Sequence, residues 1–284
     1  MDIDQARTFL AISAHGSFLE AARRLHVTQS TVSARIQNLE TELGARLFVR
    51  NRAGASLTPA GQRFVQHAKT LVLTVEQARH DVGLPSRYRS SIRIGGRIAL
   101  WEDFLPSWVG WMRRTTPDVS IRSEIGFEED LMRRLIEGTL DIGLMYTPSH
   151  APGLIVERLF DETLVMVSSN PDTRWPNEDY IYVEWGPGFY AKHRESYPDL
   201  ERPPQVVNIG WLGIQLILAN GGSCFLPIRM ARSLIQEGRL YLVEEGPEFT
   251  HPAYLVFPRE ADSEVLPQAL EGLRELARSE QMRE

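Results

Sequence analysis

Hydrogen-bonding side chains are concentrated in one segment of the chain, HVTQSTVSARIQNLETELGARLF, residues 26 to 48. At about 100° per residue, a helix here would carry apolar side chains on one side and small or polar ones opposite. The apolar side consists of Val32, Ile36, Leu39 and Leu43, and the open side of Ser30, Ala34, Asn38 and Thr41. The segment is therefore predicted to form a helix that is buried on one side and free to contact a ligand on the other.

Both ends of this helix are marked in the sequence. Thr28 stands where an N-cap hydroxyl accepts a backbone N–H of the first turn, and Gly44 follows the last apolar residue as a helix stop. The first turns carry hydrogen-bonding side chains and no acidic one, so they suit the groove of a polyanion. These side chains are Gln29, Ser30, Ser33 and Gln37.

Two further helices are predicted before this one. The first stops at Gly16 and has an apolar stripe of Ala6, Phe9, Leu10 and Ile12. The letters SFLE then predict a capping box, in which Ser17 caps a second helix over about residues 18 to 25 and Glu20 reaches back. Ala21 and Ala22 are small enough to let another helix approach, and the short turn HVT leads into the third helix. This arrangement is a helix-turn-helix.

A β-hairpin is predicted after Gly44. The letters RLFVRNRAGASLT indicate a short strand, a turn rich in Asn, Gly and Ala, and a returning strand. The hairpin would form a wing with Arg50 and Arg52 at its tip.

The net charge differs in sign between the two parts of the chain. Residues 1 to 90 contain 12 Lys and Arg against 7 Asp and Glu, a net of +5. Residues 91 to 284 contain 19 against 30, a net of −11. A basic head on an acidic body is expected when one small module meets phosphates. The alternative on charge alone is chance unevenness.

Several function classes are disfavoured by composition. The start MDIDQARTFLAI is acidic before it is apolar, unlike a secretory signal, and no apolar run approaches the roughly 20 residues that span a bilayer. A cytoplasmic location without membrane partners is expected. The single cysteine, Cys224, excludes an internal disulfide framework, and the seven histidines show no ligand spacing. Neither a metal nor a cofactor is expected.

Residues 9 to 61 resemble the winged helix-turn-helix of the LysR-type transcriptional regulators. The matching letters, in register, are Ala-Ala-x-x-Leu, Thr-Gln-Ser-x-x-Ser, Ile-x-x-Leu-Glu, Leu-Gly-x-x-Leu-Phe and Leu-Thr-x-x-Gly. The resemblance implies a DNA-bound dimer, usually assembled into a tetramer, whose third helix enters the major groove of promoter DNA. RNA polymerase is a further partner that it implies. The DNA contacts implied here are Gln29, Ser30, Ser33 and the wing arginines.

The chain departs from the family at one position of this helix. The family commonly has arginine directly after the position of Ser33, whereas this chain has Ala34 there and Arg35 next. A shift of one residue rotates the guanidinium by about 100° around the helix. Arg35 is therefore expected to contact phosphate rather than a base, while the Ala34 methyl packs on a thymine methyl.

A long connecting helix is predicted from Pro59, with Thr58 as its cap. An apolar stripe follows it at spacings of 3 and 4, as in a coiled coil, so the stripe is predicted to hold two chains together. The alternative is that the stripe packs on its own domain. The letters GLPSRYRSS then break the helix as a hinge. The predicted dimerisation residues are Phe64, Ala68, Leu71, Val75, Ala78 and Val82.

Strand-like and helix-like runs alternate from residue 91 onward, which predicts an α/β body with mainly parallel sheet. The order of segments resembles the family's effector domain, which has two lobes of the type 2 periplasmic-binding-protein kind. The predicted domains are the winged helix-turn-helix at 1–58, the linker helix and hinge at 59–90, and the effector domain at 91–284. Lobe I would comprise about 91–160 and 259–284, and lobe II about 161–258.

Ligands of such sheets bind at the carboxyl ends of strands, where the lobes diverge. The letters GGRIALWE and EWGPGFY are the strongest candidates. Arg97 is expected to hold an anion, and Trp101 and Trp185 are expected to sandwich a flat group. The alternative for Trp101 is a place in the core. The predicted effector-binding residues are Arg97, Ile98, Ala99, Trp101, Glu102, Glu184 and Trp185.

These features together predict a sequence-specific transcription regulator that binds double-stranded DNA, associates with itself and senses a small molecule. The competing hypothesis is a solute-binding protein or enzyme on the same fold. Cys224 is the one candidate nucleophile for that alternative, and it has no resolving cysteine and no histidine nearby in the sequence. No phosphate-binding loop, dinucleotide fingerprint or Ser/His/Asp signature is present, so no enzyme activity is expected.

Overall fold

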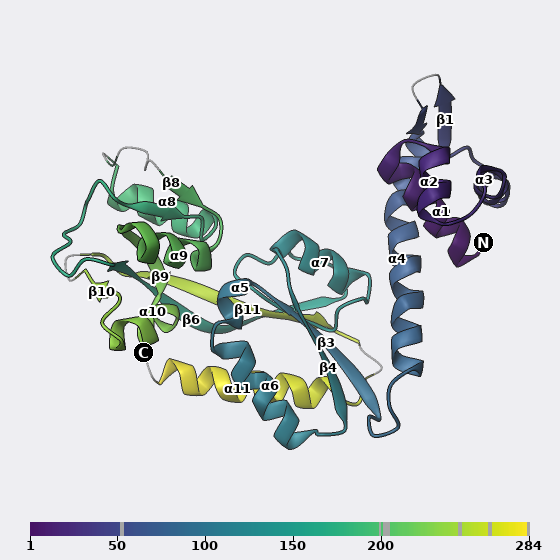
Figure 1. Ribbon diagram of the computed structural model, residues 1–284. Coiled ribbons are helices and arrows are strands. Elements are labelled where there is room, and N and C mark those ends of the chain that lie inside the picture. The colour runs from purple at the N-terminus through teal and green to yellow at the C-terminus, as the bar shows by residue number, and fades with distance from the viewer. Residues whose placement is uncertain (52–53, 199, 201–204, 244–245, 261–262, 283–284) are drawn as a thin grey trace. The chain divides into compact units, whose positions relative to one another are not determined.

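The computed structural model describes residues 1–51, 54–198, 200, 205–243, 246–260 and 263–282. The chain forms two compact units, Met1–Pro85 and Ser86–Glu284 (Figure 1). No helix of the described part is both long enough and apolar enough to cross a membrane.

The first unit begins with three helices, α1 (Ile3–His15), α2 (Phe18–Arg24) and α3 (Gln29–Leu43). A hairpin of β1 (Phe48–Asn51) and β2 (Gly54–Leu57) and the long helix α4 (Pro59–Val82) complete it. The caps act as expected for α3, because the Thr28 hydroxyl accepts the N–H of Thr31 and Gly44 adopts φ +64°. Helix α1 ends in the same way at Gly16, with φ +63°.

Two local expectations about these helices are wrong. Ser17 caps α2, but the Glu20 carboxylate does not return to the cap and instead contacts Arg23 and Arg24. Leu43 lies 41% exposed, because the last turn of α3 extends beyond the core. The capping box that does form joins Asp2 and Gln5 at the start of α1.

An aromatic core holds the wing and α4 against α1. The ring of Phe9 lies 5.2 Å from that of Phe48 and 5.0 Å from that of Phe64, measured between centroids. The Glu40 carboxylate accepts the backbone N–H groups of Leu47 and Phe48 at 2.7 and 3.2 Å, which ties α3 to the wing.

The second unit contains one large mixed sheet, formed by β3 (Ser90–Gly96), β4 (Val119–Ile125), β5 (Ile142–Met145), β6 (Leu154–Ser168), β9 (Ser223–Pro227), β10 (Tyr241–Leu242) and β11 (Phe249–Pro258). Their order is β10-β6-β11-β5-β3-β4, with β9 also paired to β6. Strand β3 is parallel to β4 and β5, whereas every pairing of β6 and β11 is antiparallel. The expectation of a mainly parallel sheet is therefore wrong.

Strands β6 and β11 pair with each other and run through both lobes of the second unit. Residues 254–256 of β11 pair with β5, while residues 164–168 of β6 pair with β9. A bulge at Ala253/Tyr254 marks the change of partner. The chain thus returns to lobe I inside β11, because this one continuous strand pairs with strands of both lobes.

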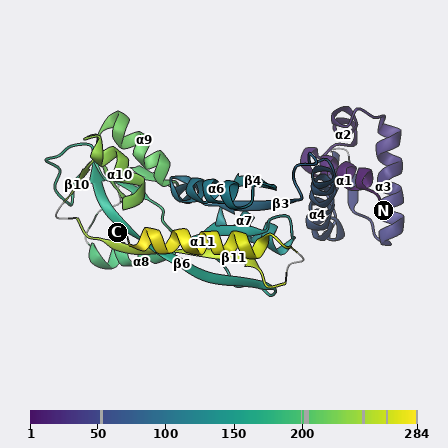
Figure 2. The ribbon, with the colours of Figure 1, turned by 90° about the horizontal axis from the view of Figure 1, so that it is seen from below.

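Helices cover the sheets of both lobes. Lobe I carries α5 (Ile98–Trp101), α6 (Phe104–Thr115), α7 (Glu128–Ile136) and the closing helix α11 (Leu266–Gln281). Helices α6 and α11 pack together (Figure 2). The Trp108 indole N–H donates to the Ala269 carbonyl at 2.9 Å. Lobe II adds a short parallel pair, β7 (Ile181–Val183) and β8 (Gln205–Val207), with α8 (Pro187–Ser196), α9 (Gly210–Asn220) and α10 (Ile228–Gln236).

Candidate DNA-binding surface and effector cleft

Helix α3 presents a polar surface at its N-terminal end. Val32, Ile36 and Leu39 are at most 2% exposed, so the apolar side of the helix is committed to the core. The opposite side is open to solvent, and the first turn contains no acidic residue. The predicted contact residues that lie exposed on it are Thr28, Gln29, Ser30, Ala34 and Gln37.

The hydroxyl groups at the start of α3 form a small network. The Thr28 Oγ1 atom lies 2.8 Å from both Ser30 Oγ and Thr31 Oγ1. A hydroxyl can donate one hydrogen bond and accept others, so the two contacts of Thr28 restrain these groups before any ligand arrives.

Two of the predicted contact residues are less exposed. Ser33 and Arg35 are half-buried. The Arg35 guanidinium lies 2.7 Å from the Asp4 carboxylate and 3.4 Å from the Thr8 hydroxyl, both on α1. A phosphate contact by Arg35 would therefore require the guanidinium to exchange Asp4 for phosphate. In the wing, β1 places Arg50 opposite Ala55, but the Arg50 side chain and all of Arg52 lie outside the described residues.

The apolar stripe of α4 is divided between two environments. Phe64 and Ala68 are 8% and 0% exposed in the core that α4 forms with α1, so their assignment to a dimer seam is wrong. The physical reason is that α1 lies beside the first half of α4 and already covers it. Leu71 and Val75 are half-buried, Ala78 is exposed and Val82 is 89% exposed.

Arg97 follows β3 but does not face an open cleft. Its Nε lies 3.3 Å from the Glu128 carboxylate, and its guanidinium carbon lies 4.5 Å from the centre of the Phe127 ring. Both partners belong to lobe I, and the Arg97 side chain is only 12% exposed. The predicted role of Arg97 as a free anion holder is thus wrong, because Glu128 already balances its charge.

The two predicted tryptophans are each anchored in their own lobe. Trp101 donates its indole N–H to the Glu124 carbonyl at 3.0 Å, and Trp185 donates to the Phe225 carbonyl at 2.8 Å. Trp185 is 6% exposed, and Ala99 is 2% exposed while Ile98 is half-buried. The expected sandwich of a flat group between the two indoles is wrong, because the hydrogen bonds hold each ring against its own strand layer.

A buried ion pair joins the two lobes. The Arg229 guanidinium of α10 bonds the Glu162 carboxylate of β6, and both side chains are 1% exposed. Arg229 also donates to the carbonyls of Ala99 and Glu102 in lobe I. The Tyr146 hydroxyl, at the end of β5, donates to Glu162 at 2.8 Å. We call Tyr146, Glu162 and Arg229 the interlobe triad.

The pKa values of two triad members, Tyr146 and Arg229, are both raised. Burial raises the pKa of the Tyr146 phenol well above its ordinary value. Burial opposes the charge of Arg229, but Glu162 outweighs this and raises the pKa of the guanidinium. The triad therefore remains a neutral phenol beside a charged guanidinium. Sequence analysis missed these residues; the available signal was a charge inside each apolar run, Glu162 in LFDETLVMV and Arg229 in FLPIRMA.

A cavity of about 610 Å³ lies beside the triad. It lies between the loop after β5 in lobe I and α8 in lobe II, and strands β6 and β11 supply residues to its wall. Of the predicted effector residues only Trp185 lines it. We call it the hinge cavity; its lining includes Tyr146, Thr147, His150, Arg158, Trp185, Phe189, Lys192, Thr250, His251 and Tyr254.

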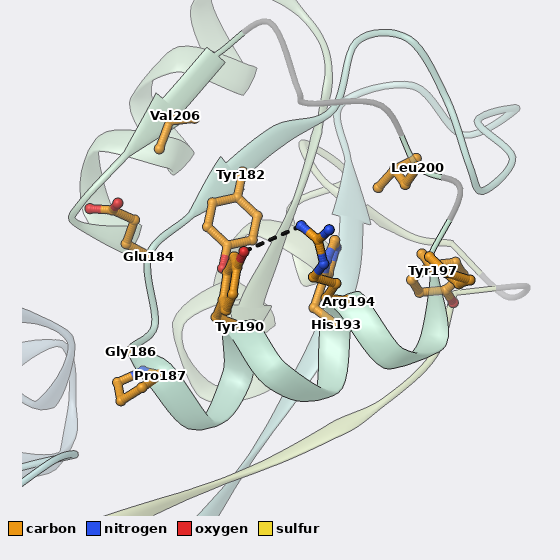
Figure 3. A pocket seen from close by; sticks show the side chains of 11 residues that line it. Tyr182, Glu184, Gly186, Pro187, Tyr190, His193, Arg194, Tyr197, Leu200 and Val206 are labelled. Carbon is orange, nitrogen blue, oxygen red and sulfur yellow. Dashed lines mark hydrogen bonds between the residues drawn. The ribbon is translucent and has the colours of Figure 1, made fainter.

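Glu184 lines a different cavity, of about 650 Å³, inside lobe II. Tyr182, Tyr190 and Tyr197 surround it, and the Arg194 guanidinium donates to the Tyr190 hydroxyl at 3.4 Å (Figure 3). Glu184 and Trp185 are neighbours in sequence but line different cavities, because consecutive residues of an extended chain point to opposite sides. They cannot serve one site.

Cys224 is wholly buried in β9. Burial raises the pKa of its thiol far above the ordinary value, so the reactive thiolate is not formed at neutral pH. The structure gives this cysteine a packing role.

The fold and its surfaces define a class of protein: a winged helix-turn-helix that presents a polar helix, followed by a two-lobed α/β domain with a cavity at the hinge. Residues 3–62 match the family described as bacterial regulatory helix-turn-helix protein, LysR family, and residues 86–280 match the LysR substrate binding domain. The chain belongs to the LysR family and is a DNA-binding transcriptional regulator with an effector-binding domain.

The sequence is similar to those of known regulators over nearly its whole length. The chain is 30% identical over 280 residues to the HTH-type transcriptional regulator HdfR of Yersinia pestis (strain Pestoides F) and to that of Yersinia pseudotuberculosis serotype O:1b, with 94% of both chains covered in each case.

Solved structures share the fold. CbnR, a LysR family transcriptional regulator, has a TM-score of 0.72 at 19% identity, covering 98% of this chain and 99% of that one. Full-length CbnR complexed with its target DNA has a TM-score of 0.73 at 19% identity, covering 97% and 100%. ArgP from Mycobacterium tuberculosis has a TM-score of 0.59 at 24% identity, covering 98% and 97%.

Proposed function

We propose that this regulator binds promoter DNA through the N-terminal end of α3 and the wing, assembles with copies of itself, and changes its output when a small molecule enters the hinge cavity. It would act in the cytoplasm, where it meets DNA and RNA polymerase, and the function requires no catalytic step. The observation that carries the proposal is the exposed, hydrogen-bonding and acid-free first turn of α3.

Specificity would come from the side chains at the front of α3. Gln29 can pair with the edge of adenine in the major groove, and Ser30 and Ser33 can donate or accept there. Ala34 would pack against a thymine methyl. Arg50 and Arg52 would contact the phosphate backbone, and Arg35 would do so after leaving Asp4.

Self-association would use two separate surfaces. The second half of α4 leaves Leu71 and Val75 partly exposed. The effector domain exposes further apolar residues, Ile125, Phe127 and Ile136 on lobe I and Val206, Trp211 and Leu212 on lobe II. One surface closes a two-fold dimer, and a second surface on the same chain lets dimers pair into a tetramer.

The experiment that tests the DNA proposal compares Gln29→Ala with wild type on genomic fragments and on random DNA. Loss of a base contact should weaken specific binding by about 1 to 3 kcal/mol and leave random DNA nearly unaffected. Gln281→Ala, the same substitution at an exposed position of α11, is the matched control. No preference of the wild-type protein for any genomic fragment would contradict the proposal.

A further inference from the structure

An acidic residue of α1 holds the one basic side chain of helix α3. We propose that Asp4 is a positioning residue that keeps Arg35 away from random DNA and releases it to phosphate in the sequence-specific complex. Asp4 thereby raises the preference of the regulator for its target. This inference rests on the proposed DNA-binding function and adds a determinant of its specificity.

The Arg35 guanidinium is held against α1 at two points. Its Nη2 donates to the Asp4 carboxylate at 2.7 Å, and its Nη1 donates to the Thr8 hydroxyl at 3.4 Å. Thr8 is buried, and its hydroxyl donates in turn to the Asp4 backbone carbonyl at 2.6 Å. Because the hydroxyl proton is already committed there, the Thr8 oxygen is available to accept from Arg35. The guanidinium thus has a defined resting position on α1.

The ion pair is open enough to be exchanged. The Arg35 and Asp4 side chains are 26% and 50% exposed, and Asp4 is the only carboxylate within ion-pair distance of Arg35 in the described part of the chain. Ion pairs as exposed as this one add little free energy, because water already solvates both charges. A phosphate oxygen accepts strong charge-assisted hydrogen bonds from a guanidinium, so it can replace the carboxylate.

The position of Arg35 on α3 brings it near the same phosphates as the hydroxyl groups at the start of the helix. Thr28, Thr31 and Arg35 follow one another at spacings of three and four, so they lie along one side of the helix. The hydroxyl oxygens of Thr28 and Thr31 lie 2.8 Å apart. A DNA strand that contacts these hydroxyl groups therefore passes within reach of a side chain as long as that of Arg35.

The cost of leaving Asp4 makes the phosphate contact selective. Random DNA is held by phosphate contacts alone, and a phosphate contact of Arg35 there must first break the pair with Asp4. At the target, contacts of α3 with base edges also hold the helix close to the phosphates, so the exchange is offset. Specificity is the difference between the two binding free energies. A residue that weakens binding to random DNA more than binding to the target therefore increases specificity.

Salt titrations of Asp4→Asn and wild type test the proposal on the full chain. The probes are a random-sequence duplex and the genomic fragment that the wild-type protein prefers, and fluorescence anisotropy measures binding between about 50 and 200 mM salt. Asp4→Asn should bind random DNA about 3-fold more tightly for each chain, because the carboxylate no longer competes. The dependence of log K on log salt should steepen by about 0.9 for each Arg35 that gains a phosphate. Binding to the preferred fragment should change less, so the preference should fall.

Two comparisons separate positioning from general charge. Asp4→Glu keeps the carboxylate and should restore the affinity and the salt dependence of wild type. In the Arg35→Gln background, Asp4→Asn should give no larger gain than Glu76→Gln gives in wild type. Glu76→Gln is the matched control, because it removes a carboxylate from another ion pair of the same unit, the pair with Arg7. The double variant isolates the coupling between Asp4 and Arg35.

The proposal is overturned if folded Asp4→Asn binds random DNA no more tightly than wild type, if its salt dependence is unchanged, or if the full gain persists in the Arg35→Gln background. Asp4→Ala also removes the carboxylate and repeats the test if the asparagine variant does not fold. The random-DNA measurement needs no preferred fragment. A failure of the proposed function, seen as no preference of wild type for any fragment, is therefore distinguishable from a failure of the exchange between Asp4 and phosphate.

Discussion

At the scale of single residues, the interlobe triad is the most constrained feature of the effector domain. Glu162 receives bonds from one residue of each lobe, and Arg229 spans from α10 to two carbonyls of lobe I. A buried ion pair costs desolvation when it forms, but removal of one partner leaves the other charge uncompensated. The ion pair therefore fixes the position of α10 against lobe I, whereas its net contribution to the free energy of unfolding is expected to be small.

Glu162→Gln should destabilise the effector domain by about 3 kcal/mol, because Arg229 would remain buried without its counter-charge. All six tryptophans lie between residues 101 and 211, so tryptophan fluorescence during urea unfolding reports on this domain alone. The matched control is Glu237→Gln, which breaks the half-exposed pair with Arg239 and should cost less than about 1 kcal/mol. If the two substitutions lowered the free energy of unfolding equally, the triad would not be a special link between the lobes.

His251 predicts a pH dependence of stability. Burial lowers its pKa to about 4, with Arg97 and Lys192 adding to the effect. In the unfolded chain His251 binds a proton near pH 6.5, whereas in the folded chain it binds one only near pH 4. The unfolding free energy should therefore fall as the pH drops through this window, by on the order of 3 kcal/mol for this group.

The measurement is urea unfolding of wild type and His251→Gln between pH 7 and 4.5. The variant should lose most of this slope but keep a smaller one, because burial also lowers the pKa of His193. Parallel slopes for the two proteins would show that His251 is not the titrating group.

At the scale of elements, a glycine in α4 permits close contact between this helix and the backbone that leads into the wing. A Cβ atom at Gly61, in the first turns of α4, would lie 2.2 Å from the Leu47 carbonyl oxygen. That oxygen belongs to the backbone and also accepts the N–H of Thr58, so it cannot move alone. Because Gly61 has no Cβ atom, the first turn of α4 can pack against Leu47, the residue just before β1.

Gly61→Ala should destabilise the first unit by about 2 kcal/mol, as expected for overpacking against backbone. Far-UV circular dichroism should show an earlier melting transition, while tryptophan fluorescence of the second unit stays unchanged. Gly110→Ala is the matched control, because its nearest contact in α6 is the flexible end of Arg114 at 3.5 Å. That substitution should stabilise α6 slightly, by about 0.5 to 1 kcal/mol.

At the scale of the whole molecule, two units of opposite charge perform different tasks. The first unit, Met1–Pro85, has 10 Lys and Arg against 7 Asp and Glu, a net of +3, and the second unit, Ser86–Glu284, has 21 against 30, a net of −9. Phosphates are therefore attracted to the first unit and repelled by the second. An effector can alter output only if it binds one arrangement of the lobes better than another. The triad and the hinge cavity lie where such a difference would be expressed, because both contain residues of each lobe.

Leu71→Asp combined with Val75→Asp should prevent dimer formation through α4, because two unpaired charges in an apolar seam cost more than the seam contributes. Sedimentation velocity of the full chain measures this. Thr74→Asp, at an exposed position of the same helix, is the control that changes charge outside the stripe. An unchanged assembly in the double variant would limit α4 to its contact with α1.

The local elements of the first unit follow from short-range patterns in the sequence. The periodicity of Val32, Ile36 and Leu39, the Thr28 cap and the Gly44 stop specify α3, because helix hydrogen bonds and caps join residues only a few positions apart. The exposed polar residues of α3 follow from the same periodicity, which is why the candidate DNA surface was predictable.

The partners of these side chains, in contrast, depend on long-range packing. The stripe of α4 is continuous in sequence, yet Phe64 packs on α1 while Val82 stays exposed. Glu162 and Arg229 are separated by 67 positions, and no local pattern relates them. Burial of a charge requires a specific partner from a distant segment, and that choice depends on how the strands cross between lobes rather than on the residues around either charge.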